Sequence, residues 1–373
     1  MQPKNPNLFR RRWPALTLAL AYPWLRLFLL LVRRPRVNGS DAVTVFQSYQ
    51  VGDFYMALPA IRHLAERISI RVLCRPDCVF VLRKLGIEAI PFPNPFPVEP
   101  GLGTFLSGIK HALALRSQLG AIALDFHADP RTAFLLKAAG ASQVYSFLRP
   151  FGWFIDHAFP ITTERRHQSE MDMAVAEKFL ASGAGKSIQG VTHPDNRQAP
   201  RPKGRTGLMV SCWTRRDEKN WPLDSWNELI AMLLREGRDL CVIVPPDGDQ
   251  NFHNFRSKWQ AKVEFLAAGL EVIHTRVEAA EGVLCTDNFL GHLGANLGKP
   301  VFWINGSSDV DHVRPYGPSV EIVQMEPMPC RPCQHCCINP IHKQCLVELR
   351  PNTVAVRAKL WLERNGLRYR PDT

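Results

Sequence analysis

The chain lacks acidic residues at its N-terminus. Residues 1–36 contain eight Lys or Arg and no Asp or Glu, which leaves only +4 of the formal net charge of +12 for the rest of the 373 residues. Basicity is therefore chiefly a property of the N-terminal arm. Beyond the arm the chain also lacks interleaved aromatic and basic residues, so we expect no nucleic-acid partner.

The cysteines lack a paired framework. Five of the ten are scattered along the chain, at Cys74, Cys78, Cys212, Cys241 and Cys285. A disulfide-stapled secreted domain would space its cysteines more regularly, so this usage predicts a reducing compartment.

Two further absences count against an ATPase and against a cleaved signal peptide. The GAGKS stretch at 183–187 resembles a phosphate-binding loop, but that pattern needs a Gly five residues before Gly185, where the chain has Leu180. No small-residue cleavage site follows the apolar run Trp13–Val32, which leads directly into Arg-Arg-Pro-Arg.

The run Trp13–Val32 is largely apolar, although Pro14, Pro23 and Arg26 interrupt it. A membrane-spanning helix needs about 20 apolar residues, and an Arg near its centre costs roughly 2.5 kcal/mol or more. We interpret the run as an interfacial helix whose aromatic and leucine side chains enter the headgroup region while the flanking arginines meet anionic lipid. A single-pass anchor and an ordinary helix packed on the protein are the alternatives.

The rest of the chain predicts two α/β domains of ordinary size, because 46% of its residues are hydrophobic and strand-like and helix-like runs alternate. The expected division is a basic arm (1–39), a first domain (40–182), a linker rich in Gly, Pro and charge (183–207), a second domain (208–350) and a C-terminal helix and tail (351–373). Expected strands include Ala42–Phe46, Ala121–Asp125, Leu208–Cys212, Leu240–Val244, Leu270–His274, Gly282–Cys285 and Pro300–Ile304. Expected helices include Phe54–Ile68, Pro130–Ala139, one from near Leu290, and Asn352–Asn365.

Polar residues follow several of these strands. Asp287 and His292 lie across a strand-to-helix turn, and a second turn, Asn305–Asp309, follows the next strand. Carboxyl ends of parallel strands are where open α/β sheets bind nucleotide-type ligands, and a helix N-terminus offers free N–H groups to phosphate. A helix cap at Asp287 and a core position for His292 are the structural alternatives.

The order T-D-x-x-x-x-H-L-x-A-x-L-G-x-P, followed by G-S-S-D, resembles the signature of family 9 glycosyltransferases, the ADP-heptose:lipopolysaccharide heptosyltransferases. Lys-x-Trp-Pro at 219–222 is similar to the donor motif of that family, and the turn with Gly52 and Asp53, followed by Pro59, is similar to its N-terminal motif. One departure is that Asn288 and Phe289 stand where the family has a small residue and then Gly.

The resemblance implies an α/β GT-B fold, in which two Rossmann-like domains with parallel sheets face a central cleft. It implies that Asp53 is the general base on the acceptor hydroxyl, and that a sugar nucleotide is held by the second domain. Its implied donor contacts are Thr214, Lys219, Asp249 (or Asp247), Asp287, His292 and Ser307. The segment LDFHADPRTA resembles the acceptor side, which makes Asp125, His127 and Arg131 candidate contacts to an anionic sugar, although an Asp-x-His can equally be a satisfied hydrogen-bonded pair.

The remaining cysteines crowd into CRPCQHCCINPIHKQC at 330–345. This spacing is typical of a structural zinc or iron site with Cys330, Cys333, Cys337 and Cys345 as ligands, and heptosyltransferases that modify proteins bind iron through similar cysteines. A reduced cluster or a disulfide is the alternative. The resemblance implies no cofactor for catalysis.

The sequence therefore predicts a glycosyltransferase that moves a sugar, heptose from ADP-heptose, to a lipopolysaccharide-type or other envelope glycan. Its expected location is the cytoplasmic face of the inner membrane, as a peripheral protein. The alternatives are a glycosyltransferase of the same fold with a different nucleotide-sugar donor, and a non-catalytic scaffold of an envelope-glycan assembly complex.

Overall fold

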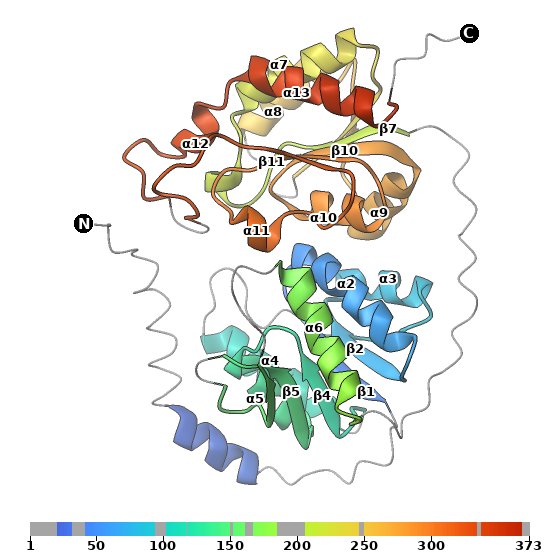
Figure 1. The fold of residues 1–373 in the computed structure, drawn as a ribbon, viewed down its shortest axis with the longest axis vertical. Helices are drawn as coiled ribbons and strands as arrows, with labels where there is room; N and C mark the ends of the chain where they lie inside the picture. The colour runs from blue at the N-terminus through green and yellow to red at the C-terminus, as the bar shows by residue number, and fades with distance from the viewer. Residues whose placement is uncertain are drawn as a thin grey trace. The chain divides into compact units, whose positions relative to one another are not determined.

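The computed structural model describes residues 21–31, 42–93, 102–116, 118–149, 152–160, 167–184, 206–245, 250–333 and 337–367. The chain divides into two compact units. Unit 1 comprises Met1–Glu164 and Ser169–Asn196, and unit 2 comprises Arg165–Gln168 and Arg197–Thr373. Each unit is built on its own six-stranded sheet (Figure 1).

The sheet of unit 1 has the order β3-β2-β1-β4-β5-β6, and every neighbouring pair is parallel. Its strands are β1 (Val43–Gln47), β2 (Ile70–Cys74), β3 (Glu88–Pro91), β4 (Ile122–Asp125), β5 (Gln143–Phe147) and β6 (His157–Phe159). Its helices are α2 (Val51–Ala65), α3 (Val79–Lys84), α4 (Leu102–Ala114), α5 (Pro130–Ala138) and α6 (Gln168–Ala181), with a short 3₁₀ turn at Pro76–Cys78.

Alternation along the strands divides the core of unit 1 between two faces. Phe46 and Val144 belong to a buried cluster that includes Ala112 of α4 and Phe134 of α5. Tyr145 points to the other face, where its ring lies 5.0 Å from that of Phe179 on α6. Parallel strands covered on both faces explain why these strands read as near-continuous apolar runs.

Unit 2 repeats the same topology with the order β12-β11-β10-β7-β8-β9, again all parallel. Its strands are β7 (Thr206–Ser211), β8 (Leu240–Ile243), β9 (Glu264–Leu266), β10 (Ala280–Thr286), β11 (Val301–Ile304) and β12 (Val320–Val323). Its helices are α7 (Leu223–Arg235), α8 (Gln250–Trp259), α9 (Leu270–Ala279), α10 (Phe289–Asn296), α11 (Val310–Val313), α12 (Gln344–Val347) and α13 (Pro351–Arg364), with a 3₁₀ turn at Asp217–Lys219.

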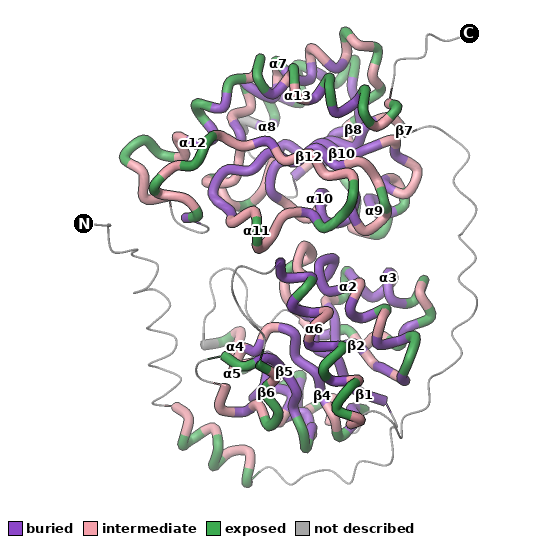
Figure 2. Tube along the Cα trace, in the orientation of Figure 1, coloured by how far each residue is buried: buried purple, intermediate pink, exposed green. Residues whose placement is uncertain are grey.

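Large aromatic side chains fill one face of the unit 2 sheet. Trp226 of α7, Phe252 of α8 and Trp361 of α13 share a buried cluster with the strands, and the central strands β7, β8, β10 and β11 are buried along most of their length (Figure 2). Helix α10 lies on the opposite face, close to the sheet. A Cβ placed on Gly294 would meet Val283 Cγ2 at 2.8 Å, so only glycine permits this close approach.

The structure differs from the sequence-based expectations in several places, among them β9 and β12, which were not expected. The segment expected as a strand, Leu270–His274, is the first half of helix α9, because Ile273, His274 and Val277 are buried at helical spacing. Helix α2 begins at Val51 rather than Phe54, which places Asp53 inside its first turn. The sequence analysis assigned no element to 143–181, where the structure has β5, β6 and α6.

The N-terminal arm is described only over residues 21–31, which are helical and belong to unit 1. Tyr22, Leu25, Phe28 and Leu29 pack against the buried cluster of that unit. No helix in the described part of the chain is both long and apolar enough to cross a bilayer.

Candidate functional site

Both sheets have a topological switch point, where the chain reverses its direction of progress across the sheet. It lies between β1 and β4 in unit 1 and between β10 and β7 in unit 2. Open α/β sheets bind ligands outside the carboxyl ends of the strands at such points. Most of the residues singled out from the sequence lie just after these strands.

In unit 2, three strand ends meet through one ion pair. Lys219 follows β7, and its Nζ lies 2.8 Å from Oδ2 of Asp287, the residue after β10. Ser308, which follows β11, donates its hydroxyl hydrogen bond to the same carboxylate oxygen. Only 18% of the Lys219 side chain and 4% of the Asp287 side chain are exposed, so water screens the pair little.

The loop that carries Lys219 is held by hydrogen bonds to the backbone. The N–H of Thr214 donates to Asn220 Oδ1 at 2.8 Å, and Asn220 Nδ2 donates back to the Thr214 carbonyl at 2.9 Å. The Thr286 hydroxyl donates to the carbonyl of Lys219 itself. These bonds fix the lysine at the end of β10, which pre-organises a positive charge where the sheet changes direction.

Helix α10 is capped by Asn288, and Asp287 is not its cap. The Asn288 Oδ1 accepts from Leu290 N at 3.0 Å, and its Nδ2 donates to Ser211 Oγ at 2.8 Å and to the Trp213 carbonyl at 3.1 Å. The side chain that departs from the family pattern therefore ties α10 to the end of β7. The Asp287 carboxylate is left for Lys219 and Ser308.

His292 lies on α10 with 6% of its surface exposed. Its Nδ1 has no hydrogen-bond partner among the described residues. Burial lowers the pKa of the imidazole to about 4, opposed by the nearby Asp287 carboxylate. A neutral imidazole with one unsatisfied nitrogen, charged only in acid, is suited to exchanging a hydrogen bond with a ligand hydroxyl.

Ser307 is also buried, with 1% exposed. Its turn is held by Asn305, whose Nδ2 donates to the Ser308 carbonyl at 3.1 Å and to Gln324 Oε1 at 3.0 Å. Arg331 donates to the same Gln324 oxygen at 2.6 Å. A chain of polar contacts thus runs from Arg331, in the cysteine-rich segment (residues 330–345), to the turn Asn305–Asp309, whose Ser308 donates to Asp287. Asp249 and Asp247 lie outside the described residues.

In unit 1, Asp53 forms a capping box at the start of α2. The Gln50 N–H donates to Asp53 Oδ2 at 3.2 Å, and the Gln50 side chain accepts from the Asp53 N–H. Gln47, the last residue of β1, donates from Nε2 to the Asp53 carbonyl at 2.8 Å. The carboxylate therefore has a structural partner in addition to any chemistry it performs.

Gln47 also connects Asp53 to the end of β4. Its Oε1 lies 2.9 Å from His127 Nε2, and the His127 ring lies 3.7 Å from that of Tyr49. Burial and the nearby Arg149 lower the pKa of His127 to about 3. His127 is therefore neutral at physiological pH, and its Nε2 and Gln47 share one hydrogen bond.

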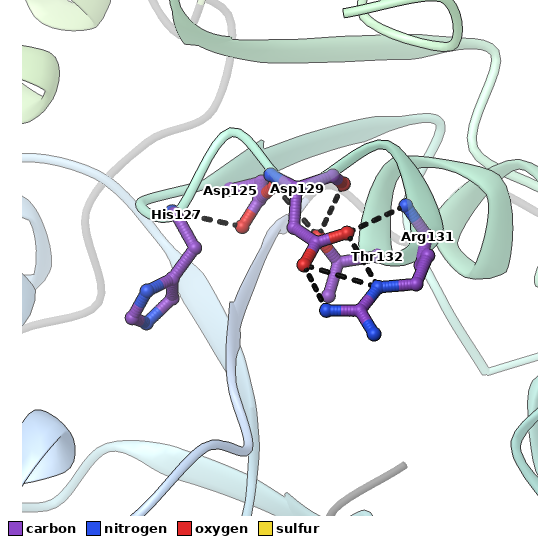
Figure 3. Close-up of polar contacts among 5 residues, drawn as sticks. All are labelled: Asp125, His127, Asp129, Arg131 and Thr132. Atoms are coloured by element: carbon purple, nitrogen blue, oxygen red, sulfur yellow. Dashed lines mark hydrogen bonds and ion pairs between the residues drawn. The ribbon is translucent and has the colours of Figure 1, made fainter. Parts of the chain in front are cut away.

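The three residues expected to contact an acceptor have different environments (Figure 3). Asp125 is fully buried, and its carboxylate accepts from His127 N, Asp129 N and Thr132 Oγ1 at 2.8–3.2 Å. Burial raises the pKa of Asp125 to about 7, although these hydrogen bonds oppose the rise. Arg131 forms a two-point pair with Asp129, with contacts of 3.0 and 2.6 Å. Asp125 organises the β4–α5 turn, while Asp129 orients Arg131.

The sequence analysis did not single out Asp129, Gln47, Asn288 or Ser308 as partners of the site. For Asp129 a signal existed, because an Asp directly before Pro and a helix is a typical N-cap, and its side chain does accept from Arg131 N. Asn288 also had a local signal as an N-cap of α10, whereas its bridge to Ser211 and the contacts of Gln47 and Ser308 join distant segments, which local sequence does not reveal.

In the cysteine-rich segment, residues 330–345, the described cysteines Cys330, Cys333, Cys337 and Cys345 are not joined in disulfides. Burial and the neighbouring cysteines raise the pKa of Cys333 to about 12. Within the described residues, no group of three or more His, Cys, Asp or Glu side chains is placed to hold a metal ion. The expected four-cysteine site is therefore not assembled there. His335 and Cys336 lie outside the described part of the chain.

Comparison with known proteins decides the family. The pattern of Glycosyltransferase family 9 (heptosyltransferase) matches residues 109–342, more than half of the chain. The chain belongs to glycosyltransferase family 9. Lipopolysaccharide heptosyltransferase 1 of Escherichia coli K12 is 26% identical over 151 residues, and this alignment covers 40% of the family 9 chain described here and 42% of that relative. The chain thus aligns with less than half the length of this curated relative.

Solved structures resemble the family 9 chain over nearly its whole length. The E. coli ADP-heptose LPS heptosyltransferase II has a TM-score of 0.64 at 15% identity, and E. coli heptosyltransferase WaaC with ADP-2-deoxy-2-fluoro heptose has 0.63 at 18%; each match covers 87% of this chain and 99% of the other. The dodecameric iron-containing heptosyltransferase TibC has 0.55 at 12%, covering 87% of this chain and 77% of TibC. The GT-B fold, with two Rossmann-like domains, is confirmed.

Proposed function

We propose that the protein is a glycosyltransferase that moves a heptose from ADP-heptose to a lipopolysaccharide-type or other envelope glycan. The observation that carries the proposal is the contact between Lys219, Asp287 and Ser308 at the switch point of unit 2, in a family 9 chain. Relatives whose names include ADP-heptose and lipopolysaccharide support the choice of donor and acceptor.

On the donor side, Lys219 supplies the positive charge. The bond between the anomeric carbon and the diphosphate oxygen breaks, and negative charge develops on the leaving nucleoside diphosphate. An ammonium already fixed at the end of β10 meets that charge without reorganisation. Thr214 and Ser307 are the hydroxyl donors proposed beside it, and Asp287 and His292 position the sugar. Asp249 is proposed as a further donor contact.

On the acceptor side, Asp53 of unit 1 is the proposed general base. It takes the proton of the acceptor hydroxyl as that oxygen bonds to the anomeric carbon. The position in the first turn of α2 favours the ionised carboxylate, because the helix dipole stabilises negative charge there. Arg131 and His127 are the proposed contacts to an anionic acceptor, with Asp125 holding the turn that presents them.

The proposed site of action is the cytoplasmic face of the inner membrane, where lipid-linked glycans are available as acceptors. Peripheral association fits the basic, apolar N-terminal arm. A structural zinc or iron at the cysteine-rich segment is a separate proposal, which metal analysis of the purified full-length protein beside Cys330→Ser/Cys333→Ser would test. No step of the transfer is assigned to that segment.

One observation favours a second candidate, a transferase with another nucleotide-sugar donor. The family usually has a small residue and then Gly where this chain has Asn288 and Phe289, and Asn288 uses its amide to bridge β7 and α10. With these two larger side chains at the turn, a sugar nucleotide has less room to come close to the backbone there. A different sugar or nucleotide would accommodate such a change.

Calorimetry with a panel of nucleotides and nucleotide sugars tests the proposal, with transfer to a lipopolysaccharide acceptor as the second readout. We expect selective binding of ADP-heptose and its turnover with acceptor. Selective binding of another nucleotide sugar would favour the second candidate. Binding without transfer to any glycan, or no binding, would leave the scaffold as the better account.

A further inference from the structure

The helix over residues 21–31 has two apolar faces. The inner face, formed by Tyr22, Leu25, Phe28 and Leu29, packs against the buried cluster of unit 1. Its rings lie against aromatic neighbours, with Tyr22 5.2 Å from Phe154 and Phe28 6.0 Å from Phe134. These contacts fix the rotation of the helix on the protein.

The outer face exposes large apolar side chains, namely Trp24 (73%), Leu27 (46%), Leu30 (76%) and Leu31 (73%). At about 100° per residue, these four positions fall within an arc of about 120° opposite the inner face. Isolated exposed hydrophobic residues are ordinary on protein surfaces, but four large apolar side chains gathered on one face of a helix form a patch typical of an interaction surface. Among the described residues nothing covers this outer face.

The charged residues within this helix and next to it in the sequence are all of one sign. Arg26 is exposed on the helix itself. In the sequence, Arg33, Arg34 and Arg36 follow directly, Arg10, Arg11 and Arg12 precede, and no acidic residue occurs before Asp41. A Trp and leucines bracketed by arginines match the surface of an anionic bilayer, with its apolar interior and negative headgroups.

We infer that the outer face of helix 21–31, formed by Trp24, Leu27, Leu30 and Leu31, is a docking surface for an anionic lipid bilayer. The helix does not lie loose on the membrane but is held to unit 1 by its inner face, so the whole unit is oriented by the contact. The inference deepens the proposed function, on which it rests for the identity of the acceptor.

The same buried cluster connects the docking surface to the acceptor side of unit 1. Tyr49 packs against that cluster together with Tyr22 and Leu25, and its ring lies 3.7 Å from the His127 ring, tilted by 36°. A unit held at a bilayer favours a lipid-linked glycan over a free, soluble one as the acceptor.

The test is co-sedimentation of the full-length protein with vesicles of phosphatidylcholine, alone or mixed with phosphatidylglycerol. We expect the wild type to bind the mixed vesicles, and added salt to weaken binding. Trp24→Glu/Leu31→Glu should bind about tenfold more weakly, since interfacial affinity scales with the apolar area inserted. The matched control is Val356→Glu/Leu360→Glu on α13, which adds the same charge at positions that are also exposed and should bind as the wild type does.

Three outcomes would overturn the inference. In the first, Trp24→Glu/Leu31→Glu binds the mixed vesicles as strongly as the wild type does. In the second, the wild type binds vesicles of phosphatidylcholine alone as strongly as the mixed vesicles. In the third, neither protein binds vesicles, and the wild type is a dimer whereas the variant is a monomer, so the outer face binds a second copy of the chain. Unfolding in urea checks that both variants fold. Calorimetry with ADP-heptose separates the two proposals, because a failure to dock leaves donor binding intact, whereas absent donor binding with normal docking counts against the proposed function alone.

Discussion

The ammonium of Lys219 lies 2.8 Å from the carboxylate of Asp287, although the two residues follow different strands of the unit 2 sheet. The pair joins the ends of β7 and β10, the two neighbours at the point where strand order reverses. The lysine is thus already positioned before any diphosphate binds, and an incoming phosphate must share it with the aspartate.

Replacing Lys219 should weaken donor binding. Lys219→Met retains the aliphatic stem but removes the charge, so the Kd for ADP should rise about 10- to 100-fold, the loss expected for one charge-assisted hydrogen bond. Calorimetry measures the change, and Lys359→Ala on α13 is the control lysine. An unchanged Kd in Lys219→Met would mean that the lysine serves only to neutralise Asp287.

The buried pair itself should contribute to stability. Asp287→Asn leaves Lys219 without its counter-charge and should lower the free energy of unfolding by about 3 kcal/mol, while Ser308→Ala, which removes one hydrogen bond, should cost about 1 kcal/mol. Urea unfolding of Asp287→Asn, Lys219→Met and the double variant gives the coupling. Strictly additive effects would show that the contact contributes nothing.

Asp53 should be needed for turnover but not for donor binding. In Asp53→Asn a neutral amide replaces the base, so transfer should fall about 10²- to 10⁴-fold. The amide oxygen can still accept from Gln50 N, so stability should change by less than about 1 kcal/mol.

Asp224→Asn is the control for Asp53, because Asp224 also lies in the first turn of a helix, α7. Single-turnover transfer, ADP-heptose calorimetry and urea unfolding are measured on both variants. Transfer by Asp53→Asn at the wild-type rate would assign the carboxylate to helix capping alone.

His292 should make the protein acid-sensitive. Its folded pKa is about 4 against an ordinary value of 6.5, so between these values the unfolded chain binds the proton and the folded chain does not. The contribution of neutral His292 to the free energy of unfolding is therefore fully present above pH 6.5 and is lost as the pH falls towards 4. From pH 7 to pH 5 the loss should be about 2 kcal/mol, and His292→Gln should lack it.

The comparison of unfolding at pH 7 and pH 5 isolates His292, because His127 and Asp125 titrate in both the wild type and the variant. Exposed His253 on α8 supplies the control, His253→Gln. The same pH dependence in His292→Gln and in the wild type would contradict the assignment.

Gly294 should resist substitution. Its Cβ would meet Val283 and Val301 side chains at 2.8 and 3.1 Å, so Gly294→Ala should push α10 from the sheet and cost about 1–3 kcal/mol. At Gly103 on α4 nothing lies within 4 Å of the added atom, and Gly103→Ala should stabilise by about 0.4–1 kcal/mol. Urea unfolding measures the free energy of unfolding of both variants. A change in the same direction for the two would contradict the prediction.

Local pattern predicted most of the fold, for a physical reason. Strands covered by helices on both faces read as short apolar runs, and the helices between them show apolar residues at helical spacing. The same rule failed at Leu270–His274, a short apolar run that belongs to helix α9. The helix extends to Ala279, and its buried residues Ile273, His274 and Val277 are spaced as on one face of a helix. Residues 143–181 offered no pattern strong enough to assign.

The candidate site was predicted as a set of residues but not as a set of contacts. Strand-to-turn transitions placed Asp287 and the turn Asn305–Asp309 at one edge of a sheet, and the family motifs placed Lys219, Ser307 and Asp53. Side chains that join distant segments, such as Gln47 and Ser308, carried no local signal, since a polar residue after a strand is ordinary until its partner is known.

By itself the sequence determined the alternation of strands and helices, the membership of family 9 and the residue types at the strand ends, because these depend on local periodicity and on short motifs. Only the tertiary structure decided which of those residues meet. It brought Lys219 to Asp287 from a different strand end, made Asn288 the cap, used Asp125 to hold a turn, and left one face of helix 21–31 exposed. Such outcomes depend on which strands pair and how closely helices pack, and distant parts of the chain settle both.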